Sequence, residues 1–437
     1  IRDIMTDTSK NNYSSAMWII GTLFFIFGFV TWLNGPLITF VKLAFNLDTD
    51  IKAFWVTTAF YMAYFFLALP SSWILEKIGM KRGMAVGLLV MAVGTFVFGT
   101  FATQRHYTIC LVGLFIIGSG LSLLQTAANP YISIVGPIET AAKRITIMGI
   151  CSKIAGILSP IILSYFVLKD VDKLQDKVNL AASEMQKEAI LNDFASHIYT
   201  PYMAMAIILV GLAFWIVKSK LPDIKSSENN SIEETINTTK TSIFQFPHLW
   251  LGVFCLFVYV GVEVFSGDGI VSYGADLGLI NGIPVGFLGL SIPFTSFTLF
   301  FMLLGYIIGL FTVPKVFSQE KALAISAISG IIFTFASYLT TGYISVIFIA
   351  LLGLSNAIMW PAIFPLAIYS LGKFTEKGSA LLIMGIVGGA IIPKLYAHLK
   401  EVIPFQNAML LVILPCYVYI LFYAVAGYRT GLKKAGN

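Results

Sequence analysis

Charged residues are scarce in this sequence, at 11% of 437 residues, whereas a soluble domain carries about 25%. Hydrophobic residues make up 57% of the chain, and its mean hydropathy is +0.85. This balance excludes an ordinary soluble domain and indicates a protein embedded in the lipid bilayer. At about 20 residues per membrane-spanning helix plus short loops, the length accommodates about twelve spans.

Cysteine and histidine are also rare, with four of each. The cysteines lie in or at the ends of apolar runs, and the histidines lie at helix ends or in loops. Their spacing therefore predicts no metal site, no disulfide framework and no histidine proton relay. The sequence also lacks a phosphate-binding glycine loop and a nucleophile–base set. We expect no enzyme, no bound cofactor and no nucleic-acid partner.

Apolar runs of helical length divide the chain into two halves, each with six predicted spans. One segment of low hydrophobicity separates them, which predicts an N-terminal bundle over residues 1–219, a cytoplasmic linker over 220–246 and a C-terminal bundle over 247–437. The predicted helices are Ala16–Phe45, Ile51–Leu75, Gly83–Ala102, Tyr107–Val135, Arg144–Leu168, Pro201–Lys218, His248–Gly274, Pro284–Val313, Ala322–Thr341, Ile344–Leu371, Gly378–Leu399 and Pro404–Tyr428. A charged insert over 169–197 is expected to be partly helical.

The halves repeat a motif, and their loops differ in charge. Gly120-Leu121-Ser122 with Pro130 in the first half parallels Gly353-Leu354-Ser355 with Pro361 in the second. An internal repeat of six helices is typical of the major facilitator fold, whose binding sites lie between the halves. The side that holds both termini and the linker carries about two thirds of the lysines and arginines, so the positive-inside rule makes it cytoplasmic.

Several runs resemble the fucose/glucose/galactose permease family of the major facilitator superfamily. They are Leu111–Ile117, Gln125–Pro130, Gly136-Pro137, Tyr259–Gly261 and Pro361–Leu366. The resemblance extends from the first to the eleventh predicted helix. It implies uptake of a hexose or 6-deoxyhexose across a bacterial inner membrane, coupled to protons or, in some relatives, to sodium.

The chain departs from the proton-coupled fucose permease at two positions. The pattern of that permease has Leu-Asn-Asp where this chain has Leu33-Asn34-Gly35, and it has Glu where this chain has Gln125. Neither replacement can take up a proton near neutral pH, so the family's proton site cannot be carried over.

Two charged residues lie deep in predicted spans. Lys153 stands nine residues after Arg144, roughly 13 Å along a helix, and Glu263 stands roughly 22 Å into the seventh helix. Charge at such depth is costly and usually faces a cavity or a partner. We therefore predict that Glu263 is a coupling carboxylate with Lys153 as its charge partner. The alternatives are a structural ion pair and, for Lys153, a side chain that reaches the interface.

Asp268 lies between Gly267 and Gly269, and this pattern predicts a break in the seventh helix. Discontinuous transporter helices bind substrates or ions at such breaks. Asp268 is therefore a candidate for binding sugar hydroxyls or a cation, and a loop position near water is the alternative.

Polar and aromatic side chains on the helices that line the cavity in the resembled fold are further candidates. Amides offer both donors and acceptors to sugar hydroxyls, and aromatic rings can stack on a sugar face. The candidates are Asn34, Gln125, Asn129, Asn356, Trp32, Trp360, Tyr61 and Tyr259. Interhelical hydrogen bonds and lipid or packing contacts are the alternative roles.

We therefore expect a monomeric secondary active sugar importer that works by alternating access, with a proton on Glu263 as the coupling step. Sodium coupling through Asp268 or Glu263 is the main alternative. An efflux antiporter and a non-transporting sugar sensor remain as further alternatives.

Overall fold

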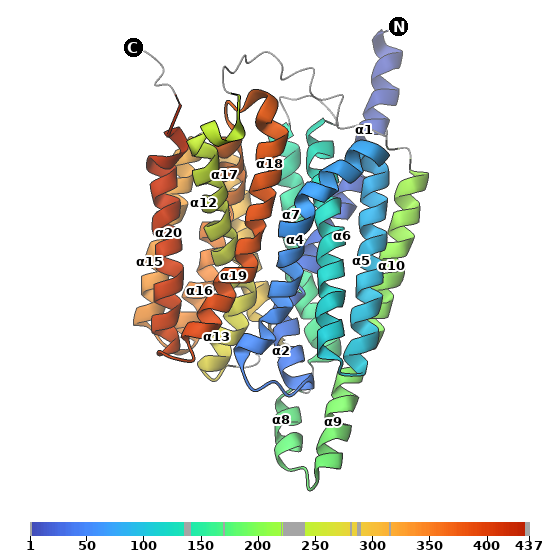
Figure 1. Cartoon of the computed structure of the whole chain (residues 1–437), viewed down its shortest axis with the longest axis vertical. Coiled ribbons are helices and arrows are strands. Elements are labelled where there is room, and N and C mark those ends of the chain that lie inside the picture. The colour runs from blue at the N-terminus through green and yellow to red at the C-terminus, as the bar shows by residue number, and fades with distance from the viewer. Residues whose placement is uncertain are drawn as a thin grey trace. The chain divides into compact units, whose positions relative to one another are not determined.

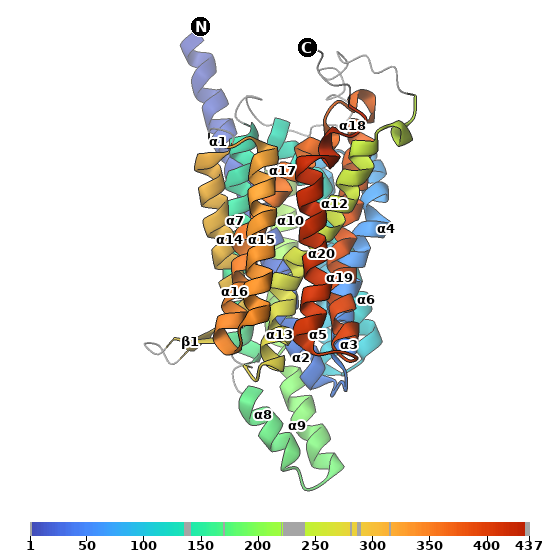
Figure 2. The same ribbon diagram turned by 90° about the vertical axis from the view of Figure 1, so that its left-hand side faces the viewer.

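The computed structural model describes residues 2–134, 141–168, 171–219, 221, 241–279, 282–285, 290–313 and 316–432 (Figures 1 and 2). It is built almost entirely of helices, and the described residues include twelve helical segments long and apolar enough to cross a membrane. The predicted all-α fold with twelve spans is confirmed. Most of the predicted linker, and the Gly136-Pro137 motif, lie outside the described residues.

Chain contacts divide the molecule into two compact units. Unit 1 comprises Ile1–Leu33, Leu43–Asn46 and Phe66–Asn229, and unit 2 comprises Asn34–Lys42, Leu47–Phe65 and Asn230–Asn437. Unit 2 therefore contains parts of the first two spans together with the last six. The predicted bundle boundaries at residues 219 and 247 stay a prediction.

Unit 1 is a bundle of long helices with a short helical pair at one end. Its elements are α1 (Arg2–Thr31), the second part of α4 (Trp55–Ile78), α5 (Met80–Thr103), α6 (Tyr107–Ile134), α7 (Ala141–Val167), α8 (Val171–Asn179), α9 (Glu184–Ser196) and α10 (Tyr199–Lys218). The charged insert is helical, as predicted. The Ser183 hydroxyl caps α9 by accepting from the Gln186 amide, which satisfies one of the free N–H groups of a helix start.

Glycines set the spacing between α5 and α6. A Cβ on Gly120 would stand 2.4 Å from the Gly87 carbonyl oxygen, and one on Gly94 would stand 2.7 Å from that of Gly113. Small residues at such crossings let helix backbones approach closely, and this packing holds membrane helices together where no hydrophobic drive exists between them.

Unit 2 contains the remaining elements. They are α2 (Asn34–Ala44), α3 (Asp50–Ala53), the first part of α4, η3 (Ile243–Gln245), α12 (Pro247–Val264), η4 (Phe265–Gly269), α13 (Ile270–Asp276), β1 (Ile283–Val285), β2 (Leu290–Ile292), α14 (Phe294–Thr312), α15 (Gln319–Leu339), α16 (Gly342–Asn356), α17 (Met359–Ile368), η5 (Gly372–Phe374), α18 (Thr375–Met384), η6 (Gly385–Val387), α19 (Gly388–Leu399), α20 (Phe405–Val425) and η7 (Gly427–Arg429).

The eighth span begins later than predicted. The sequence placed its start at Pro284, but β1 and β2 form an antiparallel pair in which Ile283 lies opposite Ile292, and α14 begins at Phe294. Proline cannot donate a backbone hydrogen bond and favours extended structure in the preceding residue. Pro284 therefore suits the hairpin, and Pro293 stands at the start of α14.

Several spans are interrupted near their middles. Turns separate α1 from α2 and α16 from α17, and η6 separates α18 from α19. The seventh span was predicted to break at the glycines beside Asp268. It instead continues through one π-helical turn, η4, so the prediction of an irregularity was correct and its form was wrong. Such π turns occur often at functional sites.

The outward-facing side chains are large and apolar. Trp73, Phe166, Ile207 and Phe311 are all more than half exposed. On a soluble protein such a surface would be an aggregation liability, but in a bilayer it contacts lipid. The chain is a multi-pass membrane protein.

Candidate substrate and coupling site

Besides Trp360, six of the predicted site residues lie in unit 2. They are Asn34, Tyr61, Tyr259, Glu263, Asp268 and Asn356, and five of them are buried while Glu263 is partly exposed. They come from α2, α4, α12, η4 and α16, so elements distant in sequence supply one set of polar groups. Of these elements, α2, α12 and α16 begin or end at an interruption.

Hydroxyl and amide groups stabilise the π turn η4. Thr298 Oγ1 donates to the Ser266 carbonyl at 2.7 Å, and Ser266 Oγ donates to the Glu263 carbonyl at 2.9 Å. The Asn356 amide donates to Ser266 Oγ at 3.2 Å and accepts from the Tyr417 hydroxyl at 2.8 Å. A π turn disrupts the regular carbonyl pairing of a helix. Thr298 of α14 and Ser266 of the turn itself satisfy two backbone carbonyl groups here, and Asn356 of α16 holds the Ser266 hydroxyl.

Glu263 lies among phenol groups. Its carboxylate hydrogen-bonds with Tyr259, and it acts electrostatically on Tyr61, Tyr306 and Tyr417. A carboxylate accepts hydrogen bonds and a phenol both donates and accepts. This arrangement can bind a polyhydroxylated ligand without a metal ion.

Asp268 is completely buried in η4. Among the described residues, neither of its carboxylate oxygens has a hydrogen-bond partner of full geometry, and the backbone of Gly35 lies beside it. A Cβ added to Gly35 would stand 3.2 Å from Asp268 Oδ1 and 2.4 Å from Thr295 Oγ1. The carboxyl group of Asp268 thus adjoins the space that a side chain at position 35 would need.

Asn34 and Tyr61 connect the interrupted first span to this set. The Asn34 side chain, at the first position of α2, hydrogen-bonds with Tyr61, and Tyr61 stacks on Tyr64 with ring centroids 6.3 Å apart. Tyr61 packs against α19, where a Cβ on Gly389 would stand 3.3 Å from its ring. Trp360 is the remaining aromatic candidate of unit 2, and its ring stacks on Phe364 at 5.9 Å.

Unit 1 brings Lys153 and Trp32 together. Both side chains are buried, and Lys153 Nζ lies 4.9 Å from the centroid of the Trp32 ring. Gly28 permits this contact, since a Cβ there would stand 2.0 Å from the Ser152 carbonyl and would force α1 away from α7. A desolvated cation over an indole face is stabilised by about 2 kcal/mol. The predicted pairing of Lys153 with Glu263 joins different units and stays a prediction.

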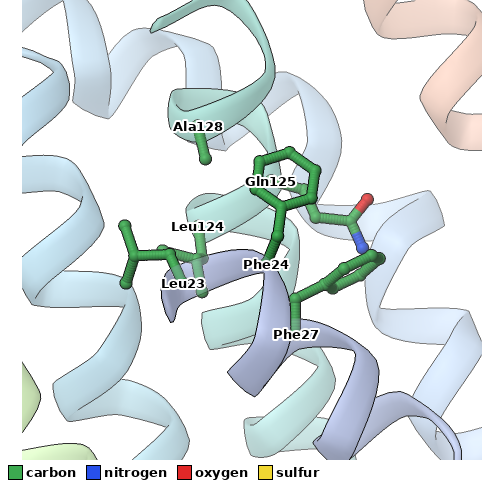
Figure 3. A pocket seen from close by; sticks show the side chains of 6 residues that line it. All are labelled: Leu23, Phe24, Phe27, Leu124, Gln125 and Ala128. Carbon is green, nitrogen blue, oxygen red and sulfur yellow. The ribbon is translucent and has the colours of Figure 1, made fainter. Parts of the chain in front are cut away.

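The remaining amide candidates, Gln125 and Asn129, are half-buried on α6 in unit 1. Gln125 lines a small pocket in which the other lining residues are apolar (Figure 3). These are Leu23, Phe24, Phe27, Leu124 and Ala128. The surface that lines this pocket is apolar throughout, so the Gln125 amide group is not aimed into it.

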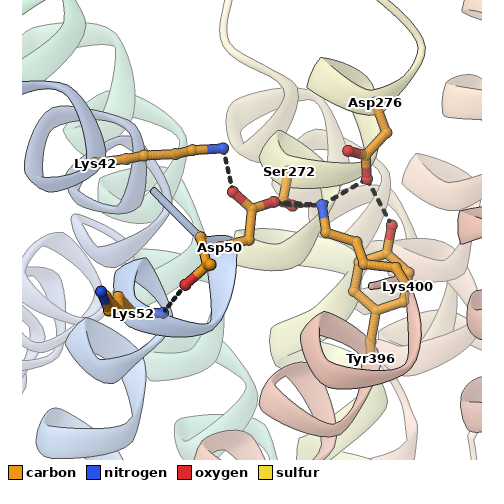
Figure 4. A network of polar contacts seen from close by, with 8 residues as sticks. Lys42, Asp50, Lys52, Ser272, Asp276, Tyr396 and Lys400 are labelled. Atoms are coloured by element: carbon orange, nitrogen blue, oxygen red, sulfur yellow. Dashed lines mark hydrogen bonds and ion pairs between the residues drawn. The ribbon is translucent and has the colours of Figure 1, made fainter. Parts of the chain in front are cut away.

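Figure 4 shows a charged network that the sequence analysis missed. Asp50 is paired with Lys42 and Lys400 and accepts from Ser272 Oγ at 2.6 Å. Lys400 also pairs with Asp276 Oδ2 at 2.6 Å, and the Tyr396 hydroxyl donates to the same oxygen at 3.1 Å. All these residues belong to unit 2. These residues lie at the ends of spans, where charged side chains are common, so the sequence alone did not indicate that they interact.

No group of three or more His, Cys, Asp or Glu side chains in the described part of the chain could hold a metal ion.

Comparison with known proteins gives a match to the Major Facilitator Superfamily model over residues 20–393. This chain belongs to the Major Facilitator Superfamily. A glucose/galactose transporter of Brucella abortus biovar 1 (strain 9-941) is 33% identical over 426 residues, which cover 97% of this chain and 96% of that protein. An L-fucose-proton symporter of Escherichia coli (strain K12) is 26% identical over 422 residues, 96% of this chain and 94% of that protein.

Two solved structures are similar to this chain. FucP in an outward conformation is 25% identical, with a TM-score of 0.70 over 94% of this chain and 98% of FucP. The inward-open xylose transporter XylE of E. coli is 11% identical with a TM-score of 0.67 over 94% of this chain and 95% of XylE, and it shares the fold alone. The family and fold predicted from sequence are confirmed, and the superfamily consists of transporters, not enzymes.

Proposed function

We propose that this chain is a secondary active transporter that imports a hexose or 6-deoxyhexose together with a proton. One observation carries the proposal: the chain matches, from end to end, relatives named glucose/galactose transporter and L-fucose-proton symporter. The side chains of unit 2 support it, because buried amide, carboxylate and phenol groups suit a polyhydroxylated substrate.

The proposed sugar site combines hydrogen-bonding and stacking groups. Asn356 accepts from and donates to sugar hydroxyls, and Asn34 and Tyr61 complete this side of the site. Gln125 and Asn129 are the proposed contributors of unit 1. Further candidates for the sugar's apolar face and hydroxyls are Trp32, Trp360, Tyr259 and Asp268.

For coupling, the sequence-based proposal is a proton on Glu263 with Lys153 as its charge partner. Protonation of a carboxylate weakens its attraction for a cation, and such a change can bias two conformations of a transporter. Sodium is the alternative coupling ion. We further propose a monomer in the bacterial inner membrane with both termini in the cytoplasm, from the distribution of positive charge.

The test is uptake of radiolabelled glucose, galactose and L-fucose into proteoliposomes, with a proton gradient and a sodium gradient imposed separately. Accumulation driven by the proton gradient and abolished by a protonophore is the expected result. Accumulation driven only by the sodium gradient would show that sodium, and not the proton, is the coupling ion. Absence of sugar binding and uptake would overturn the proposed function. Protein-free liposomes are the control.

A further inference from the structure

We propose that the proton is carried by Asp268, whose carboxyl group in the π turn η4 lies against Gly35 and Thr295. This inference rests on the proposed function, since it names the group that binds the coupled ion. It assigns Glu263 to the sugar and Asp268 to the proton, which differs from the assignment made from sequence alone.

The carboxyl group of Asp268 is closed to solvent. Asp268 is 0% exposed, and no described residue provides either oxygen with a full hydrogen bond. Thr295 Oγ1, also fully buried, is likewise without a partner among the described residues. Asp268 Oδ1 and Thr295 Oγ1 lie 3.2 Å and 2.4 Å from the position that a Cβ atom on Gly35 would occupy. A protonated carboxyl can donate a hydrogen bond in this space, whereas an ionised one can only accept.

Charged groups close to Asp268 affect whether its carboxyl group is ionised. The titratable groups on the elements of unit 2 that pack against η4 are His248, Cys255, Tyr259 and Glu263 on α12, Tyr273 and Asp276 on α13, Tyr306 on α14, Tyr343 on α16, and Lys394, Tyr396 and His398 on α19, and Tyr61 on α4 also lies near. Glu263 acts on Asp268 with the same sign as an ionised carboxylate, whereas Lys394 lies over the Trp55 ring and Asp276 pairs with Lys400. An isolated carboxylate in such surroundings is very costly, and binding a proton removes the charge.

Asp50, in the same unit, has the opposite environment. It is also buried, yet it is held by two lysines and a serine hydroxyl. Those partners stabilise the ionised form of Asp50, so its carboxylate does not bind a proton in this conformation. Two aspartates in opposite environments take different roles, and the unpaired one is suited to proton binding.

A hydrogen bond connects the turn that holds Asp268 with the proposed sugar site. Asn356 donates to Ser266, which lies two residues before Asp268 in the π turn. A sugar hydroxyl that takes the Asn356 amide group would remove this bond from the turn. Because Asp268 is closed to water here, its proton can exchange only after a rearrangement. Sugar binding and proton exchange would then depend on the same turn.

The experiment compares Asp268→Asn with Glu263→Gln in proteoliposomes, and Asp193→Asn on the exposed side of α9 is the control. Asparagine resembles the protonated carboxyl in shape. We expect Asp268→Asn to lose proton-driven accumulation and the pH dependence of sugar exchange, while exchange of labelled for unlabelled sugar persists. Glu263→Gln should weaken sugar binding, and the control should match wild type.

Full proton-driven accumulation by Asp268→Asn would overturn the inference and leave the proposed function standing. Failure of the wild type to bind or accumulate any sugar would overturn the proposed function instead. A second measurement covers a variant that folds poorly: infrared spectra of the wild type should contain the C=O band of a protonated carboxyl that responds to sugar. Asp268→Glu should retain a shifted band and pH-dependent uptake, and a wild type without a sugar-responsive band would also overturn the inference.

Discussion

Asp50 and Lys400 are 350 residues apart in the chain and form an ion pair in which both side chains are less than one-tenth exposed. Asp50 stands at the start of the second span and Lys400 follows α19, so the pair fixes the segment Leu47–Phe65 to the last helices within unit 2. Ser272 and Asp276 of α13 complete the network.

Loss of the Asp50 charge should destabilise unit 2. Asp50→Asn leaves Lys400 buried with Asp276 as its remaining carboxylate, and removal of one partner of a buried pair costs about 3 kcal/mol. We expect a clear fall in the thermal unfolding midpoint of the purified protein, measured by fluorescence. An unchanged midpoint would show that Asp276 alone neutralises Lys400.

Asp48→Asn is the matched control for that change. Asp48 pairs with Lys52 at 2.8 Å, and both side chains are more than half exposed. The hydrogen bond from Lys52 lowers the pKa of Asp48. A lowered carboxyl pKa adds stability above its unfolded-state value that is lost as pH falls through the folded-state value. Exposed pairs contribute little, so we expect no measurable shift at neutral pH.

A methyl group at position 35 should disturb the site. In Gly35→Ala the new Cβ would stand 2.4 Å from Thr295 Oγ1, and overpacking of this kind costs about 1–3 kcal/mol. Thr295→Ala in the same chain should recover much of the loss, because it removes the colliding oxygen. Gly211→Ala is the control in α10, where the Cβ would meet nothing within 4 Å; it should stabilise by up to about 1 kcal/mol. Equal unfolding midpoints for the two alanine variants would contradict the packing around Gly35.

The π turn should depend on Thr298. Thr298→Val keeps the shape but removes the donor to the Ser266 carbonyl, and an unsatisfied buried group costs about 1–3 kcal/mol. Weaker sugar binding should accompany the loss, since Ser266 also accepts from Asn356. Thr312→Val, on the same helix with an exposed hydroxyl bond to Ile308, should bind sugar normally. Similar sugar affinities in the two valine variants would show that sugar binding does not depend on the π turn.

The predicted Lys153–Glu263 pair has a test in a double-mutant cycle. If the two charges interact in the transport cycle, Lys153→Met and Glu263→Gln together should impair uptake less than the sum of the single changes. The comparison cycle is Lys153→Met with Trp32→Leu, which should show coupling of about 2 kcal/mol in thermal stability from the buried cation–π contact. Additive effects on uptake in the first cycle would show that the two charges do not interact during transport.

Much of the fold followed from the sequence, because membrane helices are determined by local hydropathy. A run of about 20 apolar residues must satisfy its own backbone in lipid and therefore forms a helix wherever it occurs. The twelve spans were predicted in this way, whereas the irregularity beside Asp268 was indicated by its two flanking glycines. The start of the eighth span was missed because a hairpin rich in apolar residues has the same hydropathy as a helix.

The site depended on tertiary structure. Amides, acids and aromatics on the right spans could be named, and Asn34, Tyr61, Tyr259, Glu263, Asp268 and Asn356 do lie in one unit. Their partners could not be named, since lateral contacts join residues that are far apart in the sequence and leave no periodic pattern. Only the folded chain placed Asp268 against Gly35, Lys153 over Trp32 and Asp50 beside Lys400. Hydropathy determines which residues enter the membrane, but the packing of helix against helix decides which buried charge has a partner and which has none.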